Sequence, residues 1–242
     1  MERLQKIIAN AGYCSRRKAE ELIEKRKVLL NGRISGLGDK AGEDDVIAVE
    51  GKELVRRDKK YYYILNKPKG ILVTKEDPQG RKTIYDLDSM KALEKKIGLK
   101  LNYVGRLDGM SEGLLILTND GEFNNLLTHP SHSVSKTYLV RTEPTLSEED
   151  VLKLKNGVMI DTRKMFGEIS KRVKNEFKIT IGEGRNRIIR RVMESLGYTV
   201  YRLKRVSVGE VKLKGIQEGT LHEMTKEEIE SLQKYSISDE FL

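Results

Sequence analysis

The sequence has one cysteine, three histidines and no tryptophan, and this scarcity excludes several kinds of site. With Cys14 alone, neither a disulfide framework nor a four-cysteine zinc site can form within one chain, and we expect this thiol to be buried and structural. His129 and His132 come nearest to a metal cluster, but no further ligands stand beside them. We therefore expect no bound metal.

Long apolar runs and nucleotide-binding loops are also missing. No run approaches the roughly 18 residues of a membrane span, and the first twelve residues lack the apolar segment of a secretory signal. Neither a GxxxxGK[ST] loop nor a GxGxxG motif after a strand is present, so nucleotide hydrolysis and dinucleotide binding have no support. We expect a soluble, cytoplasmic protein with no membrane partner and no small-molecule cofactor.

Positive charge, in contrast, is abundant. The 242 residues include 46 Lys and Arg against 37 Asp and Glu, a net charge of +9. The excess is concentrated in residues 1–40, with ten basic and five acidic side chains, and in residues 183–215, with nine and three. Two such regions favour a polyanion such as RNA as the partner. The alternative for any single basic run is an ordinary solvated face.

Residues 1–58 have the pattern of a small helix–helix–strand module. Apolar residues recur at helical spacing in residues 2–11, and Ser15 is a suitable N-cap for a second helix. Cations in the first turn of that helix oppose its dipole, which indicates a requirement other than stability, such as anion binding. The apolar residues 28–30 precede Asn31-Gly32, a sequence typical of a tight hairpin.

This order of elements, with SRRKAEELIEKRKVLLNG at its centre, resembles the RNA-binding module of the ribosomal-protein-S-four type. The resemblance implies that the two-helix face and the following turn contact structured RNA. The cations of this face are the expected phosphate contacts: Arg16, Arg17, Lys18, Lys25, Arg26 and Lys27.

Beyond a short charged linker at 55–60, residues 59–232 predict one α+β domain. Helices are expected at 147–156 and 186–196, and the last residues, 233–242, are expected to form a loose tail. The strand-like segments lack a regular βαβ period, which favours a mixed, mainly antiparallel sheet flanked by helices. These segments are 61–65, 113–118, 137–141, 177–181 and 198–208.

Two segments of this domain could carry chemistry. The first is a polar loop from Arg106 to Gly113, which holds Asp108 between two apolar stretches and ends near Ser111, a possible cap for the next segment. An aspartate in such a loop is also a common turn-former. The second segment is 183–209, where Asn186 is a plausible N-cap and arginines cluster along the following helix. Clustered guanidiniums repel unless they meet carboxylate or phosphate, although a solvated helix face is again the alternative.

Six stretches of the chain together resemble the RsuA/RluB/RluF-type ribosomal RNA pseudouridine synthases. They run in the family's order, and with the N-terminal module the resemblance covers about residues 1–232. The stretches are LNKPKG (65–70), DPQGRKTIYDL (77–87), GRLDGMSEGLLILTNDGE (105–122), HP (129–130), KTY (136–138) and GRNRIIRR…LGY…LKR (184–205).

The resemblance implies the pseudouridine synthase fold and a set of roles. Asp108 matches the catalytic aspartate, Tyr138 the tyrosine that stacks on the target uracil and is a candidate for proton transfer, and Arg190 the arginine that pairs with the aspartate. Ile188 stands where the family usually has Gln, and Gly109 or Met110 where it has a longer polar residue, which leaves the exact substrate open. Further RNA contacts implied by the motifs are Arg106, Lys136, Arg185, Asn186, Arg187 and Arg191.

The implied activity is isomerisation of a specific uridine in ribosomal RNA, free or in a subunit precursor, by a monomer. The reaction breaks a carbon–nitrogen bond, turns the uracil and rejoins it through carbon, so it needs no redox partner or external group. It does need an ionised carboxylate near the ribose, as nucleophile or as stabiliser of a glycal-like route, and we expect Arg190 to hold Asp108 by a two-pronged contact. The alternative is a non-catalytic RNA-binding or ribosome-assembly protein on the same scaffold.

Overall fold

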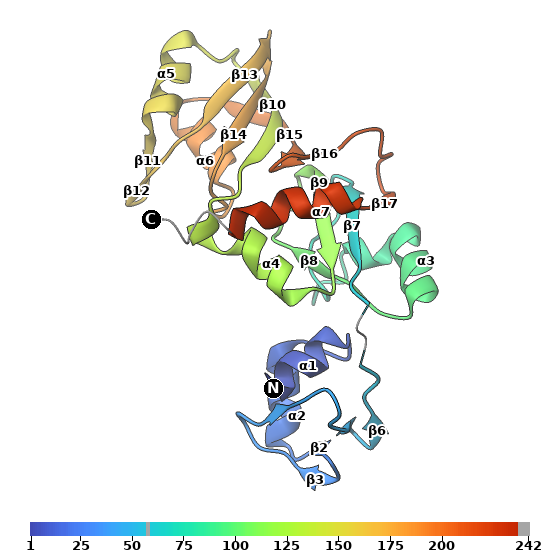
Figure 1. The fold of residues 1–242 in the computed structure, drawn as a ribbon. Helices are drawn as coiled ribbons and strands as arrows, with labels where there is room; N and C mark the ends of the chain where they lie inside the picture. The colour runs from blue at the N-terminus through green and yellow to red at the C-terminus, as the bar shows by residue number, and fades with distance from the viewer. Residues whose placement is uncertain (57–58, 237–242) are drawn as a thin grey trace.

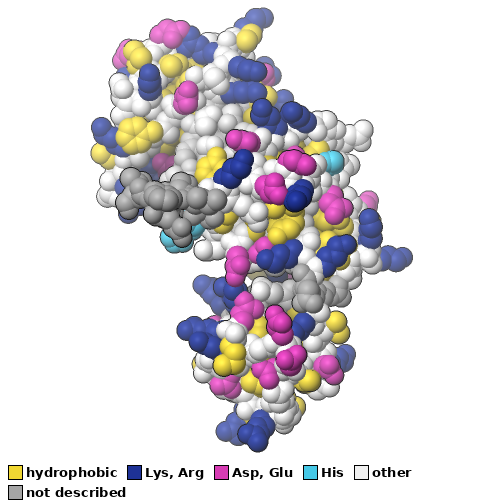
Figure 2. All heavy atoms as spheres, in the orientation of Figure 1, with side chains coloured by type: hydrophobic (Ala, Val, Ile, Leu, Met, Phe, Trp, Pro, Cys, Tyr) yellow, Lys and Arg dark blue, Asp and Glu magenta, His cyan; other side chains and the backbone are white. Residues whose placement is uncertain are grey.

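A computed structural model of the chain describes residues 1–56 and 59–236. It consists of a small N-terminal module and a larger body, joined by a narrow waist (Figures 1 and 2). The middle of the predicted linker and the end of the predicted tail, residues 237–242, lie outside the described residues.

The module contains two helices packed on short strands, as the sequence pattern predicts. Ser15 caps the second helix, since its hydroxyl accepts a hydrogen bond from the Lys18 N–H. Asn31 and Gly32 both have positive φ, so the predicted tight hairpin between β2 and β3 is confirmed. Cys14 is only half-buried, against the module's core. The elements are β1 (Glu2–Arg3), α1 (Leu4–Asn10), α2 (Arg16–Glu24), β2 (Val28–Leu30), β3 (Arg33–Ile34), β4 (Lys40–Ala41), β5 (Ile47–Val49) and β6 (Lys52–Glu53).

The body is built on one mixed sheet with the strand order β13-β14-β10-β15-β9-β7-β17. β16 pairs with β15, and β8 pairs with β9. Every pairing except that of β15 with β9 is antiparallel, which confirms the predicted α+β class with a mainly antiparallel sheet. The strands are β7 (Tyr62–Lys67), β8 (Asn102–Val104), β9 (Glu112–Thr118), β10 (Lys136–Glu143), β11 (Val158–Ile160), β12 (Arg163–Met165), β13 (Glu168–Val173), β14 (Glu176–Ile181), β15 (Thr199–Val208), β16 (Val211–Lys212) and β17 (Leu221–Glu223).

Helices cover both faces of this sheet. On one face α4 and α7 lie side by side, and on the other lie α3, α5 and α6 (Figure 1). The helices are α3 (Asp88–Ile97), α4 (Gly121–Thr128), α5 (Glu148–Asn156), α6 (Ile188–Ser195) and α7 (Lys226–Gln233), with short 3-10 turns η1 (Ile84–Asp86), η2 (Pro130–His132) and η3 (Lys234–Ser236). Because η3 continues from α7 and Tyr235 packs on the core, the chain stays folded beyond the predicted start of the tail.

β9 is an interior strand, between β15 and β7, and all seven of its residues are buried. Leu114 and Ile116 face the core beneath α4, whereas Leu115 and Leu117 face the opposite core, as expected for a strand with period-two alternation. Its parallel neighbour β15 approaches so closely at Gly113 that a Cβ there would lie 2.3 Å from the Arg205 carbonyl oxygen. A glycine is therefore required where the polar loop enters the sheet.

Candidate active site

A cleft of about 1050 Å³ opens between the loop before β9, the strands β10 and β15, and the segment that leads into α6. These elements are far apart in the sequence and meet only in the folded sheet. Many of the predicted site residues line this cleft: Arg106, Asp108, Lys136, Tyr138, Arg185, Asn186 and Arg187.

Asp108 occupies the turn that precedes β9. The Ser111 N–H donates to the Asp108 carbonyl oxygen at 3.1 Å, and the Ser111 hydroxyl donates to Asp108 Oδ2 at 2.8 Å. Ser111 was expected to cap the next segment. That segment is the strand β9, as the apolar residues 113–118 predict, and the Ser111 hydroxyl bonds back to Asp108. The turn itself orients the carboxylate, whose side chain is 25% exposed at the cleft wall.

Arg190 reaches the same carboxylate from α6, since its Nε lies 3.6 Å from Asp108 Oδ2. Main-chain carbonyl oxygens hold the guanidinium from two sides, with Nη1 donating to Val200 at 3.1 Å and Nη2 to Met110 at 3.2 Å. The prediction of a two-pronged contact between Arg190 and Asp108 is therefore wrong. Only Nε faces the carboxylate, because the other two guanidinium nitrogens donate to main-chain carbonyl oxygens. The Arg190 guanidinium therefore lies beside the carboxylate without closing over both of its oxygens.

Tyr138 lies on β10 at the floor of the cleft and is 8% exposed. In the antiparallel pairing of β10 with β15 it stands opposite Arg205, a residue at the end of the last sequence motif for which the sequence predicted no role. Arg205 also lines the cleft and is 3% exposed. The spacing along the predicted strand was the available signal. Arg205 stands two residues after the apolar Leu203, so both side chains point to the same face of the sheet, and both are buried.

Lys67 is a second residue that sequence reasoning missed. It ends β7 with no exposed surface, and its Nζ donates to the carbonyl oxygens of Pro68 and Ser111, each at 2.8 Å. Burial lowers the pKa of Lys67 to about 8, while the charges of Asp108 and Glu112 act in the opposite direction. A lysine at the end of an apolar strand, before a proline, was the available signal.

Arg185 and Arg191 fasten the β11–β12 hairpin to the edge of the cleft. Arg185 Nη1 donates to the Ile160 carbonyl oxygen at 3.0 Å and its guanidinium also pairs with Glu183, whereas Arg191 pairs with Asp161 in the hairpin turn. Both were predicted as RNA contacts, and the structure engages both guanidiniums in contacts with the protein.

The start of α6 also differs from the sequence prediction. Its N-cap is Arg187, with φ of 48°, and not Asn186. The chain therefore turns into the helix one residue later than predicted. Arg187 is exposed there and lines the cleft next to the N-terminus of α6.

The six basic side chains predicted to contact RNA in the module are all exposed. Lys18 pairs with Glu21 at 2.9 Å and Lys27 with Glu50 at 2.8 Å. Arg16 extends toward the body, where its Nη2 lies 3.3 Å from the position that a Cβ on Gly121 would occupy. Acidic and basic side chains are interspersed over the visible face of the module (Figure 2).

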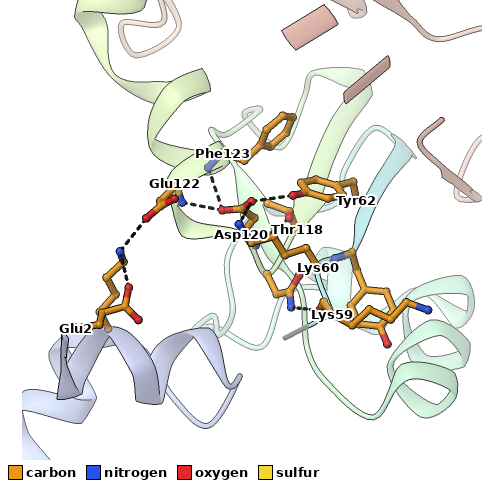
Figure 3. A network of polar contacts seen from close by, with 11 residues as sticks. Glu2, Lys59, Lys60, Tyr62, Thr118, Asp120, Glu122 and Phe123 are labelled. Carbon is orange, nitrogen blue, oxygen red and sulfur yellow. Dashed lines mark hydrogen bonds and ion pairs between the residues drawn. The ribbon is translucent and has the colours of Figure 1, made fainter. Parts of the chain in front are cut away.

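A polar network anchors the end of the linker to the start of α4 (Figure 3). Asp120 Oδ2 accepts hydrogen bonds from the Tyr62 hydroxyl at 2.7 Å and from Lys60 Nζ at 2.9 Å, while Oδ1 caps α4. Burial alone would raise the pKa of Asp120, but these hydrogen bonds outweigh it and lower the pKa below its ordinary value. Asn119 adds a hydrogen bond from the Tyr61 N–H to its Oδ1 at 2.8 Å.

In the part of the chain that the structure describes, no cluster of three or more His, Cys, Asp and Glu side chains could hold a metal ion. Within the same residues, no helix combines the length and apolar character that a membrane span requires.

Comparisons with known proteins assign two families to the chain. A family model described as RNA pseudouridylate synthase matches residues 61–195, and one described as S4 domain matches residues 2–47. The chain is 39% identical over 240 residues to the ribosomal large subunit pseudouridine synthase B of Bacillus subtilis (strain 168), covering 96% of each chain. It is 40% identical over 226 residues to the protein of that name from Vibrio cholerae serotype O1 (strain ATCC 39315 / El Tor Inaba N16961), covering 88% of this chain and 68% of the relative.

A solved structure described as a pseudouridylate synthase is similar as well. It is 30% identical and superposes with a TM-score of 0.69, over 96% of this chain and all of the other.

Proposed function

The chain belongs to the RNA pseudouridylate synthase family, and from that premise we propose that it converts a uridine of large-subunit ribosomal RNA to pseudouridine with Asp108 as the catalytic carboxylate. The observation that carries this assignment is the position of Asp108, which faces Arg190 Nε at 3.6 Å inside a cleft large enough for an extruded nucleotide. The named relatives support large-subunit ribosomal RNA as the substrate.

Asp108 acts on the ribose of the extruded nucleotide. Its carboxylate receives a hydrogen bond from Ser111 and faces the positive charge of Arg190, so it is directed into the cleft before substrate arrives. Such preorganised contacts lower the barrier because no reorientation is needed during the reaction. Tyr138 offers an aromatic ring for stacking of the uracil, a contact worth about 1–3 kcal/mol.

Exposed cations supply the affinity for RNA. Arg106 and Arg187 lie at the mouth of the cleft, and the module contributes its own exposed cations. Contacts with phosphates offset the few kcal/mol that unstacking the target base costs. The cleft is formed within one chain, so we propose that a monomer acts on cytoplasmic ribosomal RNA.

The test is a map of pseudouridines in ribosomal RNA from cells with and without this gene, followed by reaction of the purified protein with the unmodified RNA. The expected result is one or a few positions that lose pseudouridine in the deletion strain and regain it in vitro. RNA binding with no pseudouridine formed at any position would instead identify a non-catalytic RNA-binding or ribosome-assembly protein.

A further inference from the structure

Two cations share the floor of the cleft with Tyr138. Lys136 and Tyr138 are two residues apart on β10 and therefore project from the same face of the sheet, and Arg205 stands opposite Tyr138 on β15. All three line the cleft. Arg205 is 3% exposed and Lys136 is half-buried.

Among the described residues, no carboxylate forms an ion pair with either cation. Lys136 Nζ donates to the Val134 carbonyl oxygen at 2.8 Å, and Arg205 Nε donates to the Leu114 carbonyl oxygen at 2.7 Å. These neutral oxygens fix where the cations point but do not cancel their charge. Burial, and after it the charge of Arg205, lowers the pKa of Lys136 to about 8.

Buried positive charge of this kind is costly unless an anion meets it. The phosphates of an RNA strand lie on its backbone, and the exposed Arg106 and Arg187 at the cleft mouth are placed to meet them. The uracil base, in contrast, is expected at the floor of the cleft, where it stacks on Tyr138. An anion that arises on the base during the reaction is therefore the one that fits the position of Lys136 and Arg205.

The reaction generates such an anion. When the C1′–N1 bond breaks, its electron pair leaves on the uracil, whose negative charge is shared by N1, O2 and O4. The ribose either forms a C1′–oxygen bond to Asp108 or gives its C2′ proton to Asp108. Once the base has turned, C5 bonds to C1′; on the first route the C1′–oxygen bond to Asp108 breaks as this bond forms, and on the second Asp108 returns the proton to C2′. The C5 proton is then lost, and N1 gains a proton. Atoms and electrons balance with no co-reactant.

We propose that Lys136 and Arg205 stabilise the departing uracil anion, acting as catalytic residues of the reaction that the proposed function assigns to this cleft. Preorganised charges aimed at the place where charge develops lower the barrier to bond breaking more than they strengthen binding of the neutral substrate. Both cations should therefore affect the rate of the chemical step more than the affinity for RNA.

The experiment uses the full-length protein under single-turnover conditions with two RNAs, one carrying uridine and one carrying 5-fluorouridine at the target position. Fluorine makes the uracil a better leaving group, which needs less stabilisation. Because its C5 has no proton to lose, the rate compared for the two RNAs is the loss of the starting nucleotide. We expect Arg205→Met to slow consumption of the uridine substrate by about 10²-fold to 10³-fold, with the Kd for RNA within about twofold of wild type. The penalty on the fluorinated substrate should be about tenfold smaller.

Lys136→Met serves as the second variant, because Lys136 is less buried and its replacement disturbs packing less. It should show the same difference between the two substrates. Arg187→Met is the control at the cleft mouth, where we expect weaker RNA binding and equal penalties on both RNAs.

Equal penalties in both floor variants, or a weaker Kd with an unchanged rate, would overturn the inference and indicate a phosphate contact instead. An inactive wild-type protein would overturn the proposed function itself, so the two failures are distinguishable.

Discussion

The cations of the N-terminal module and those of the cleft are held in different ways. In the module they are exposed, and where they have partners these are surface carboxylates, as in the pairing of Lys18 with Glu21. In the cleft and around the Asp108 turn at its wall, the cations are buried or half-buried, and their hydrogen bonds go to main-chain carbonyl oxygens; they are Lys67, Lys136, Arg190 and Arg205.

The difference shows what each kind of charge can do. Exposed charges are screened within about 8 Å at physiological ionic strength, so they attract a polyanion and give salt-dependent affinity. A buried cation bound to carbonyl oxygens has a fixed direction and an uncancelled charge in a medium of low polarity, where its field is stronger. The module is therefore suited to affinity, and the cleft to chemistry.

The largest effect is expected from Asp108→Asn, which removes the carboxylate that Arg190 faces. The amide keeps the shape of the side chain but can neither attack the ribose nor accept a proton from it. Turnover should fall by about 10⁴-fold or more. The Kd for RNA, measured by filter binding, should stay within about twofold because affinity comes from exposed cations. A turnover rate near that of wild type would contradict the role of Asp108.

Arg190→Met comes next, with an expected loss of about 10²-fold to 10³-fold in single-turnover rate. The change removes the positive charge beside Asp108 and the hydrogen bonds that Arg190 donates to the carbonyl oxygens of Val200 and Met110. Arg190→Lys should also be impaired, because an ammonium cannot span these two oxygens and still face Asp108.

The matched control for Arg190→Met is Arg187→Met, three residues earlier and exposed. Arg187→Met should weaken RNA binding and leave the rate at saturating RNA less affected. The reverse outcome, a lost rate in the Arg187 variant alone, would mean that Arg187 is the arginine that acts on Asp108.

A smaller effect should appear in the pH profile of kcat/KM. With a pKa of about 8, Lys136 is charged below that pH and loses its charge above it, so activity should fall about tenfold between pH 7 and pH 9. Lys67 has a similar pKa, also about 8. The variant Lys136→Arg distinguishes the two lysines, because arginine stays charged at pH 9. If Lys136 is responsible, the activity of this variant should no longer fall between pH 7 and pH 9. A fall that persists unchanged would point to Lys67.

The smallest effect on catalysis is expected in the module. Replacing Arg16, Arg17 and Lys18 by Ala should reduce the slope of log affinity against log salt by about 0.9 for each phosphate that the module no longer neutralises. The rate at saturating RNA should change less than the affinity. Binding measured across a salt series checks this, and an unchanged slope would mean that these side chains do not contact phosphate.

Local patterns predicted much of the fold. The Ser15 cap and the Asn31-Gly32 hairpin were predictable because each depends on a few adjacent residues. The failures have a common cause in contacts distant in sequence. No role was predicted for Arg205, because its burial depends on the pairing of β15 with β10 and β9, which are distant in the sequence.

The same limit applies to the site. Family motifs brought Asp108 and Arg190 together correctly, but not their geometry, because the oxygens that hold Arg190 belong to Val200 and Met110 in other segments. Arg185 was predicted to contact RNA because it is a basic residue within a family motif. Only the folded structure shows that its guanidinium donates to the Ile160 carbonyl oxygen in the β11–β12 hairpin.

The anchored linker has a further consequence. Leu54 is buried in the module's core, and the Tyr61 N–H is bound by Asn119 in the body. The intervening stretch, fully extended at about 3.3–3.6 Å per residue, spans no more than about 25 Å. RNA that the module binds, as proposed above, would reach the cleft at a local concentration in the millimolar range. Among many uridines, a linker of this length would favour those at a matching distance from the RNA structure that the module binds.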